Sequence, residues 1–166
     1  MSTVLLDAHQ YAASSNNYSF SDIREWLNGG FYDSAFSLGN SLIQTTMVDN
    51  SASTTDSSSN NYACASTEDK VYLLSYKDYL NADYGFSTSA DSTTTRQCKT
   101  TDWARANGAW YSTDSSCLYN GYYWTRSPYS SYSGYAWGVS NDGHLSDSYV
   151  DDSGYSVRPS LRIKVA

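Results

Sequence analysis

The stretch YAWGVSNDGHLSDSYV, residues 135–150, predicts a β-hairpin. Asn141-Asp142-Gly143 places turn-forming residues between two strand-like segments, which is a strong short-range signal for a hairpin. The segment GYYWTRS (121–127) precedes it and predicts a third strand, because aromatic and β-branched residues favour strands. The three segments would form an antiparallel sheet late in the chain.

The chain closes on YSVRPSLRIKVA (155–166). Apolar residues at 157, 161, 163 and 165 alternate with polar residues at 158, 160, 162 and 164. This period of two is typical of a half-buried strand. We therefore expect a further strand there.

Helices are predicted earlier in the chain, in SFSDIREWLNGGFYDSAFS (19–37). Ser19 or Ser21 can cap the first helix, and Gly29-Gly30 would end it before a second short helix. TTDWARANGAW (100–110) predicts another helix, capped by Thr101 or Asp102, with Trp103 on its inner side. The expected class is α+β, with two early helices, an antiparallel sheet and long irregular loops, in a single domain over residues 1–166.

Composition limits the classes of function. Aromatic residues make up 16% of the 166 residues, including 17 Tyr and 5 Trp, which is too high for a disordered chain. The net charge of −7 argues against a nucleic-acid partner, which would require a basic face. No apolar run reaches the length of a membrane span, so we expect no membrane insertion. The start of the chain also lacks the pattern of a signal peptide.

No metal, cofactor or catalytic residue is predicted. The three cysteines, at 64, 98 and 117, include no CxxC pair, and His9 and His144 are far apart in the sequence. Three free thiols or a Cys98–Cys117 disulfide both fit the spacing. His144 follows a turn with no positioned Ser, Cys or Glu partner, which is more typical of a surface residue than of a catalytic base.

Three motifs carry a resemblance to a known family. WTRSP (124–128), AWGV (136–139) followed by DG (142–143), and VRPSL (157–161) resemble the frame of bacterial and phage proteins with a C-type-lectin-like fold. The resemblance implies that Trp124, Ala136, Val139, Val157 and Leu161 are buried. The arginines at 126 and 158 would be structural, each tied to a carboxylate or to carbonyl groups. The chain departs from the frame at Ser156 and Tyr123, where glycine and tryptophan are usual.

Within that family the chain is similar to the variable proteins of diversity-generating retroelements. Those proteins display a ligand-binding face whose codons are diversified at adenines, so that Asn codons yield Tyr, Ser, Asp and Gly but not Glu, Lys, Gln or Met. Residues 127–157 contain none of the latter four types and are rich in the former. The resemblance implies a variable ligand-binding region at about residues 122–157.

The composition of YSSYSGYAW (129–137) agrees with a binding face. Tyr offers a rigid contact area with a hydroxyl that tolerates water, and Ser and Gly add adaptable hydrogen bonding, as in antibody loops. We expect five exposed, clustered tyrosines at 129, 132, 135, 149 and 155. The predicted ligand-binding residues are Tyr129, Tyr132, Tyr135, Trp137, His144, Ser146, Ser148, Tyr149, Asp151 and Tyr155. Trp137 fits either the face or the frame, and the alternative for the whole stretch is a sheet surface that is polar only for solubility.

The predicted function is therefore a metal-independent ligand-binding display domain of a receptor or adhesin type, not an enzyme. A protein partner is expected, with a carbohydrate as the alternative. The expected location is extracellular, at a cell surface or on a phage virion. The competing functions are a structural or adhesion domain without diversification, and an enzyme related to formylglycine-generating enzymes, whose copper-binding cysteine pair the three thiols do not match. The sequence also lacks the E-P-N, Q-P-D and W-N-D motifs of calcium-dependent lectins.

Overall fold

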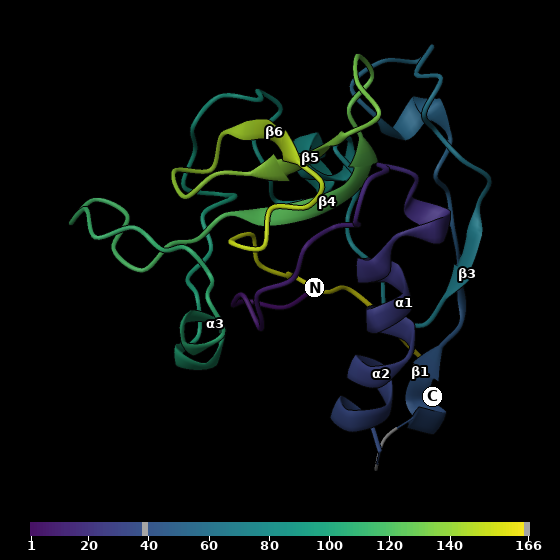
Figure 1. Cartoon of the computed structure of the whole chain (residues 1–166), viewed down its shortest axis with the longest axis horizontal. Coiled ribbons are helices and arrows are strands. Elements are labelled where there is room, and N and C mark those ends of the chain that lie inside the picture. Colours follow the sequence, from purple (N-terminus) through teal and green to yellow (C-terminus); the bar gives the residue numbers. More distant parts are fainter. Residues whose placement is uncertain (38–39, 165–166) are drawn as a thin grey trace.

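The longest strands of the fold form a three-stranded antiparallel sheet (Figure 1). These strands are β4 (Tyr123–Pro128), β5 (Tyr135–Val139) and β6 (Leu145–Tyr149), with β5 in the middle. The computed structural model describes residues 1–37 and 40–164. The predicted hairpin and the strand before it are confirmed.

The β5–β6 turn explains why glycine stands at position 143. Gly143 has a φ of +86°, in the left-handed region that favours glycine. A Cβ at this position would lie 2.0 Å from the carbonyl oxygen of Thr93, and the Thr93 N–H donates to the Asp142 carbonyl oxygen at 3.1 Å. Glycine therefore permits both the turn and the close approach of the segment that packs on it.

The sheet separates two apolar clusters. Trp124 lies opposite Gly138, and Tyr123 lies opposite Val139. Side chains opposite each other share a face, and neighbours along a strand point to opposite faces. Trp124 and the β5 residue Ala136 accordingly belong to one cluster, which the early helices also contact. Tyr123 and Val139 belong to the other.

Two short helices follow one another early in the chain, as predicted. They are α1 (Asp22–Asn28) and α2 (Gly30–Ala35). Ser21 caps α1, and its hydroxyl oxygen accepts a hydrogen bond from the Arg24 N–H at 3.3 Å. Ile23 and Leu27 are fully buried, because they lie four positions apart on the helix face that meets the sheet cluster.

The third helix, α3 (Asp102–Ala106), is also present, but its orientation differs from the prediction. Thr101 caps it and accepts from the Ala104 N–H at 3.0 Å. Ala104 is the fully buried residue, whereas Trp103 is 65% exposed and donates its indole N–H to Asp7. A five-residue helix gives too little periodicity to assign its inner face from sequence.

Two small antiparallel sheets flank this centre. β1 (Ile43–Gln44) pairs with β7 (Arg162–Ile163), and β2 (Thr46–Val48) pairs with β3 (Thr67–Asp69). Short 3-10 helices occupy residues Tyr18–Phe20, Asn40–Leu42, Ala52–Thr54, Asp78–Leu80 and Ala82–Tyr84.

The terminal segment is not the long half-buried strand that the alternation predicted. Residues 155–160 are buried on every side, because the segment runs between the first ten residues and β4. The N–H groups of Leu6 and His9 donate to carbonyl oxygens of this segment, and Ser156 bridges to Tyr123. Ile163 is 60% exposed, which contradicts its predicted inward position. Position 165 lies outside the described residues.

The frame residues of the resemblance are buried with one exception. Trp124, Ala136, Val139 and Val157 have no exposed surface. Leu161 is only partly buried, which corrects its prediction. The chain is thus α+β, with early helices, antiparallel sheets and long loops, and its three cysteines are free thiols.

Candidate functional site

Six aromatic side chains form a continuous group on one face of the β4–β5–β6 sheet. We call this group the outer ring cluster. Its ring centroids lie 4.3 Å (Tyr135–Tyr149), 5.2 Å (Tyr132–Tyr135), 6.3 Å (Tyr129–Tyr135), 5.4 Å (Tyr129–Trp137) and 4.6 Å (Tyr76–Trp137) apart. The members are Tyr76, Tyr129, Tyr132, Tyr135, Trp137 and Tyr149.

Strand register places three of these rings together. Tyr135 lies directly opposite Tyr149, and Trp137 lies opposite Asp147. Tyr132 and Tyr149 are 56% and 59% exposed, as predicted, whereas Tyr129 and Tyr135, which were also predicted to be exposed, are only half-buried. The cluster therefore offers neighbouring rings to solvent, supported from beneath by the sheet. Contiguous exposed aromatic surface of this kind is typical of interaction sites.

A single buried side chain holds the loop that carries Tyr129 and Tyr132. The amide Nδ2 of Asn16, only 1% exposed, lies 3.2, 3.1 and 2.8 Å from the carbonyl oxygens of Tyr129, Tyr132 and Tyr135. The Asn16 backbone N–H donates to the Ser133 carbonyl oxygen at 2.8 Å. These bonds close residues 129–135 into a tight loop and thereby set where its rings stand.

The polar loop at residues 51–66 supports the same region from the other side. Asn60 is buried and donates to the carbonyl oxygen of Pro128 at 2.9 Å. The Ser130 hydroxyl donates to Asp56 at 2.5 Å. The loop at residues 51–66 therefore supports the tyrosine-bearing loop through hydrogen bonds.

The charge near the outer ring cluster is mainly acidic. Asp147 lies on the same face as Tyr135 and raises the pKa of its phenol, after the larger effect of a hydrogen bond with Tyr149 and that of desolvation. Together these effects raise the pKa of Tyr135 to about 12. Asp56 similarly contributes to a raised pKa of Tyr76, whose main cause is burial. Lys77 lies 5.8 Å from the Tyr76 ring and adds one positive charge at this end.

The structure divides the ten predicted ligand-binding residues between both faces of the sheet. Tyr155 is only 6% exposed, so its predicted place on the binding face is wrong. Ser146 and Ser148 alternate with Asp147 and so point to the opposite face from the outer ring cluster. On that face the Ser148 hydroxyl donates to the Asp152 carboxylate at 3.3 Å.

Tyr155 belongs instead to an inner ring stack. Its ring lies 4.0 Å from Trp124 and 5.4 Å from Tyr122, which stacks on Trp110 at 4.4 Å. A Cβ at Gly138 would lie 2.5 Å from the Tyr155 ring, so this glycine makes room for the stack. The stack is named by its members Trp110, Tyr122, Tyr155 and Trp124.

His144 and Asp151 are exposed, but neither contributes a contact within the outer ring cluster. His144 stands beside the β5–β6 turn, at the opposite end of the hairpin from Tyr135 and Tyr149. Asp151 follows the end of β6. In the described part of the chain, no three His, Cys, Asp or Glu side chains gather in an arrangement that could hold a metal ion.

Both predicted structural arginines are confirmed. Arg126 is 6% exposed and binds the Asp78 carboxylate at 2.8 Å and the carbonyl oxygens of Leu73 and Asp49. Arg158 is 7% exposed and donates to the Ser2 carbonyl oxygen. Both guanidinium groups therefore bind groups within the fold, as structural arginines do.

Sequence reasoning missed Tyr76 and Asn16. Tyr76 ends the segment DKVYLLSY, and its position 53 residues before Tyr129 gives no local sign that the two rings meet. Asn16 lies in a polar segment, YAASSNN (11–17), that resembles any surface loop. Only the fold brings these residues to the site.

Comparisons with known proteins complete the description. No curated protein and no solved structure matches the chain significantly. None of the helices in the described residues is long and apolar enough to cross a membrane. One family model, described as a domain of unknown function, matches residues 1–165, and the chain therefore belongs to this family, DUF6273.

Proposed function

We propose that the chain is a non-catalytic, metal-independent ligand-binding domain with a C-type-lectin-like fold, and that the outer ring cluster is its binding face. The observation that carries the proposal is the run of six contacting rings, of which Tyr132 and Tyr149 are more than half exposed. A protein is the proposed partner, and a carbohydrate is the alternative. The proposed setting is a cell surface, the extracellular space or a phage virion.

The chemistry of the cluster favours a protein partner. Each Tyr ring provides broad apolar contact while freezing only two torsions, and its hydroxyl still bonds water or a ligand. Aromatic residues dominate the energetically important positions of protein interfaces. The nearby Asp56 and Asp147 would complement basic groups on the partner.

The buried roles of the frame motifs support the proposed C-type-lectin-like fold. In WTRSP, Trp124 donates its indole N–H to the His9 carbonyl oxygen at 2.9 Å, and Ser127 accepts from the Tyr76 N–H at 2.9 Å. In VRPSL, Arg158 donates to the Tyr123 hydroxyl at 3.0 Å. These motifs join distant segments, as a conserved structural frame would.

Diversification at adenines is the finer part of the proposal. The loop at 129–135 is held through backbone carbonyl oxygens by Asn16, so its side chains can change without loss of these bonds. That separation of backbone from side chain suits a variable face. A reverse-transcriptase gene and a near-repeat of the last third of this gene in the neighbouring DNA would support the idea, and an uninterrupted neighbourhood without either would refute it.

Two matched libraries test the binding face without knowledge of the natural partner. In the first, positions 129, 132, 135 and 149 receive degenerate codons derived from AAC. In the second, the same codons replace four exposed positions outside the cluster, namely 20, 103, 111 and 119. Both are displayed and selected against one purified protein.

The proposal expects folded binders from the first library and few or none from the second, since all four cluster positions adjoin one another beside the central sheet. Equal recovery from both libraries, or failure of the first alone, would reject the cluster as the binding face. A melting curve with and without a chelator checks the metal-independent part. The two curves should coincide, and a fall of several degrees would favour a metal-dependent domain.

A further inference from the structure

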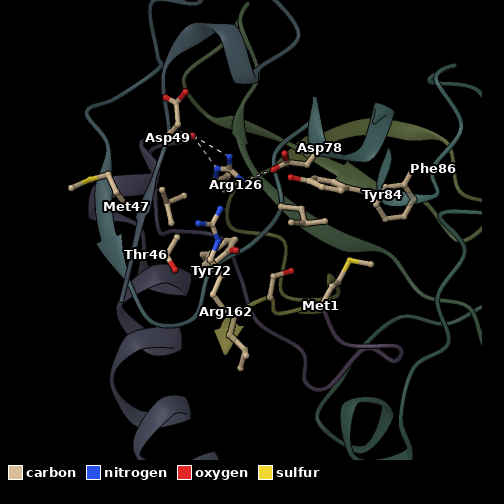
Figure 2. Close-up of a pocket in the computed structure, with 14 residues that line it drawn as sticks. Met1, Thr46, Met47, Asp49, Tyr72, Asp78, Tyr84, Phe86, Arg126 and Arg162 are labelled. Atoms are coloured by element: carbon tan, nitrogen blue, oxygen red, sulfur yellow. Dashed lines mark hydrogen bonds and ion pairs between the residues drawn. The ribbon is translucent and has the colours of Figure 1, made fainter. Parts of the chain in front are cut away.

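A cavity separate from the outer ring cluster lies between β2, the segment at 72–86, β4 and the end of the chain (Figure 2). Its volume is 480 Å³, within the range of small-molecule sites. None of the six cluster residues lines it. Leu161, the frame residue that is only partly buried, forms part of the wall. Leu161 was expected to be buried, and an expected core residue that instead lines a cavity is often found at a functional site.

Most of the charge in the cavity is already neutralised. Arg126 donates its N–H groups to the Asp78 carboxylate and to the carbonyl oxygens of Asp49 and Leu73. Asp78 also accepts from the Ser75 N–H at 2.8 Å. The Asp49 carboxylate turns away from Arg126 and accepts from the Ser51 N–H (Figure 2). These groups form a stable polar wall.

Arg162 is the exception. It rises from β7 into the cavity toward Arg126 (Figure 2), and it has no ion pair or side-chain hydrogen bond among the residues that the structure describes. Beside it, Ser160 is 4% exposed, and its hydroxyl oxygen is buried without a hydrogen-bond partner in the described chain. A free guanidinium and an unpaired hydroxyl thus stand at one end.

The remaining wall is apolar and partly aromatic. Tyr84, 57% exposed, lies with Phe86 on one side of the cavity, whereas Met47, 63% exposed, lies on the opposite side, with Arg126 and Arg162 between them (Figure 2). Exposed apolar side chains around a concave polar site are the usual lining of a ligand pocket. The two ends of the cavity therefore differ in chemistry.

We propose that this cavity binds a small organic anion with one carboxylate and an apolar body. The planar Arg162 fork matches a carboxylate with two parallel hydrogen bonds. Ser160 could add a third after rotation about its single side-chain torsion. A dianion such as phosphate fits less well, because the carboxylates of Asp49 and Asp78 are near. The apolar body would lie against Tyr84 and Phe86, which share one side of the cavity (Figure 2).

The test is an NMR titration of the whole isotope-labelled chain with 3-phenylpropanoate, compared with the neutral 3-phenylpropanamide. Arg162→Gln removes the free charge and should keep the fold, since Arg162 is exposed. Lys164→Gln is the matched control, because it removes a positive charge from the same end of the chain outside the cavity. Melting curves verify that both variants fold.

The acid should shift signals of Tyr84 and Phe86 in a saturable way in the unmodified chain and in Lys164→Gln. Arg162→Gln should weaken this binding about tenfold or more, as expected for loss of a charge-assisted pair. Equal binding of acid and amide, an unaffected Arg162→Gln, or no saturation would overturn the proposal.

A second arm identifies the source of the carboxylate. The tripeptide acetyl-Gly-Gly-Phe is titrated with a free and with an amidated C-terminus. Tighter binding of the free-acid peptide than of 3-phenylpropanoate assigns the site to chain termini of a partner. Binding of 3-phenylpropanoate alone assigns it to a free small molecule, and both results keep the single-carboxylate chemistry.

Discussion

The two faces of the β4–β5–β6 sheet carry rings of the same kinds in opposite situations. On one face, Tyr149 and Tyr132 stand in solvent within the outer ring cluster. On the other, Tyr155 and Trp124 stack at 4.0 Å inside the core. The difference shows that ring content alone says little about role. What covers each face of the sheet decides whether a tyrosine stabilises the fold or remains available to a partner.

The covering is provided by the ends of the chain. The first residues and the segment at 155–160 cross the inner face, and the helices α1 and α2 pack behind them. The outer face is covered at the end next to the β5–β6 turn. There Tyr79 and Phe86 pack in one apolar cluster with Val139 and Leu145. The other end of that face, with Tyr135 and Tyr149, stays open.

The largest expected effect is on the inner face. Trp124→Ala should lower the free energy of unfolding by about 3–5 kcal/mol, because it removes a fully buried ring and its hydrogen bond to His9. Chemical denaturation measures the change. Trp103→Ala, at a 65% exposed indole, is the control and should cost less than about 1 kcal/mol. Similar losses for the two would break the distinction between covered and open rings.

One tyrosine on each face of the sheet allows the same substitution to be compared between the covered and the open face. Tyr155→Ala should cost about 3 kcal/mol, because it opens a cavity within the inner ring stack. Tyr149→Ala, on the open face, should cost about 1 kcal/mol or less. Both variants differ from the parent by the same atoms, so denaturation curves isolate the effect of the face. A loss at Tyr149 as large as that at Tyr155 would make the outer ring cluster a part of the core.

The loop anchor should have an intermediate effect. Asn16→Ala leaves the carbonyl oxygens of Tyr129, Tyr132 and Tyr135 without their shared donor and should cost about 1–3 kcal/mol. Amide hydrogen exchange should accelerate at residues 129–135 before the rest of the sheet. Asn61→Ala, at an exposed asparagine, should leave exchange unchanged. Uniform acceleration across the sheet would contradict a local anchoring role for Asn16.

The smallest effect concerns proton binding. The hydrogen bond with Tyr149 is the main cause that raises the pKa of Tyr135 from 10.0 to about 12. Because the folded pKa is the higher one, the bond stabilises the fold below about pH 10, and this contribution disappears as the pH rises toward 12. NMR titration of the Tyr135 ring should show the raised pKa, and Tyr149→Phe should lower it. Tyr132→Phe should lower it less, since Tyr132 is the weakest of the causes. An unchanged Tyr135 pKa in Tyr149→Phe would refute the bond.

Local signals in the sequence determined much of the fold. The Asn141-Asp142-Gly143 turn, the serine cap at 21 and the threonine cap at 101 were all predicted, because each depends on residues within a few positions of one another. The prediction of a half-buried terminal strand was wrong, because burial in this segment depends on residues far away in the sequence. Its alternation between 157 and 164 is real, but Pro159 and the segments on both sides of it bury the polar positions 158 and 160 as well.

The positions of the rings on the proposed binding face were predicted only in part, and the errors have one physical cause. Tyr/Ser-rich composition correctly placed Tyr129, Tyr132, Tyr135 and Tyr149 together, because three of them lie on one loop and the fourth faces Tyr135 across the hairpin. Tyr155 has the same neighbours in composition, yet it lies under the sheet, where Gly138 leaves space for it.

Local sequence thus indicated the α+β class, the hairpin and a supply of rings at the end of the hairpin away from its turn. The tertiary structure alone decided which rings are open, that Tyr76 joins them, that Asn16 anchors their loop, and that Arg162 enters a cavity. Each of these depends on contacts between segments tens of residues apart, and burial there is set by whatever packs on a face. Neither periodicity nor composition contains that information.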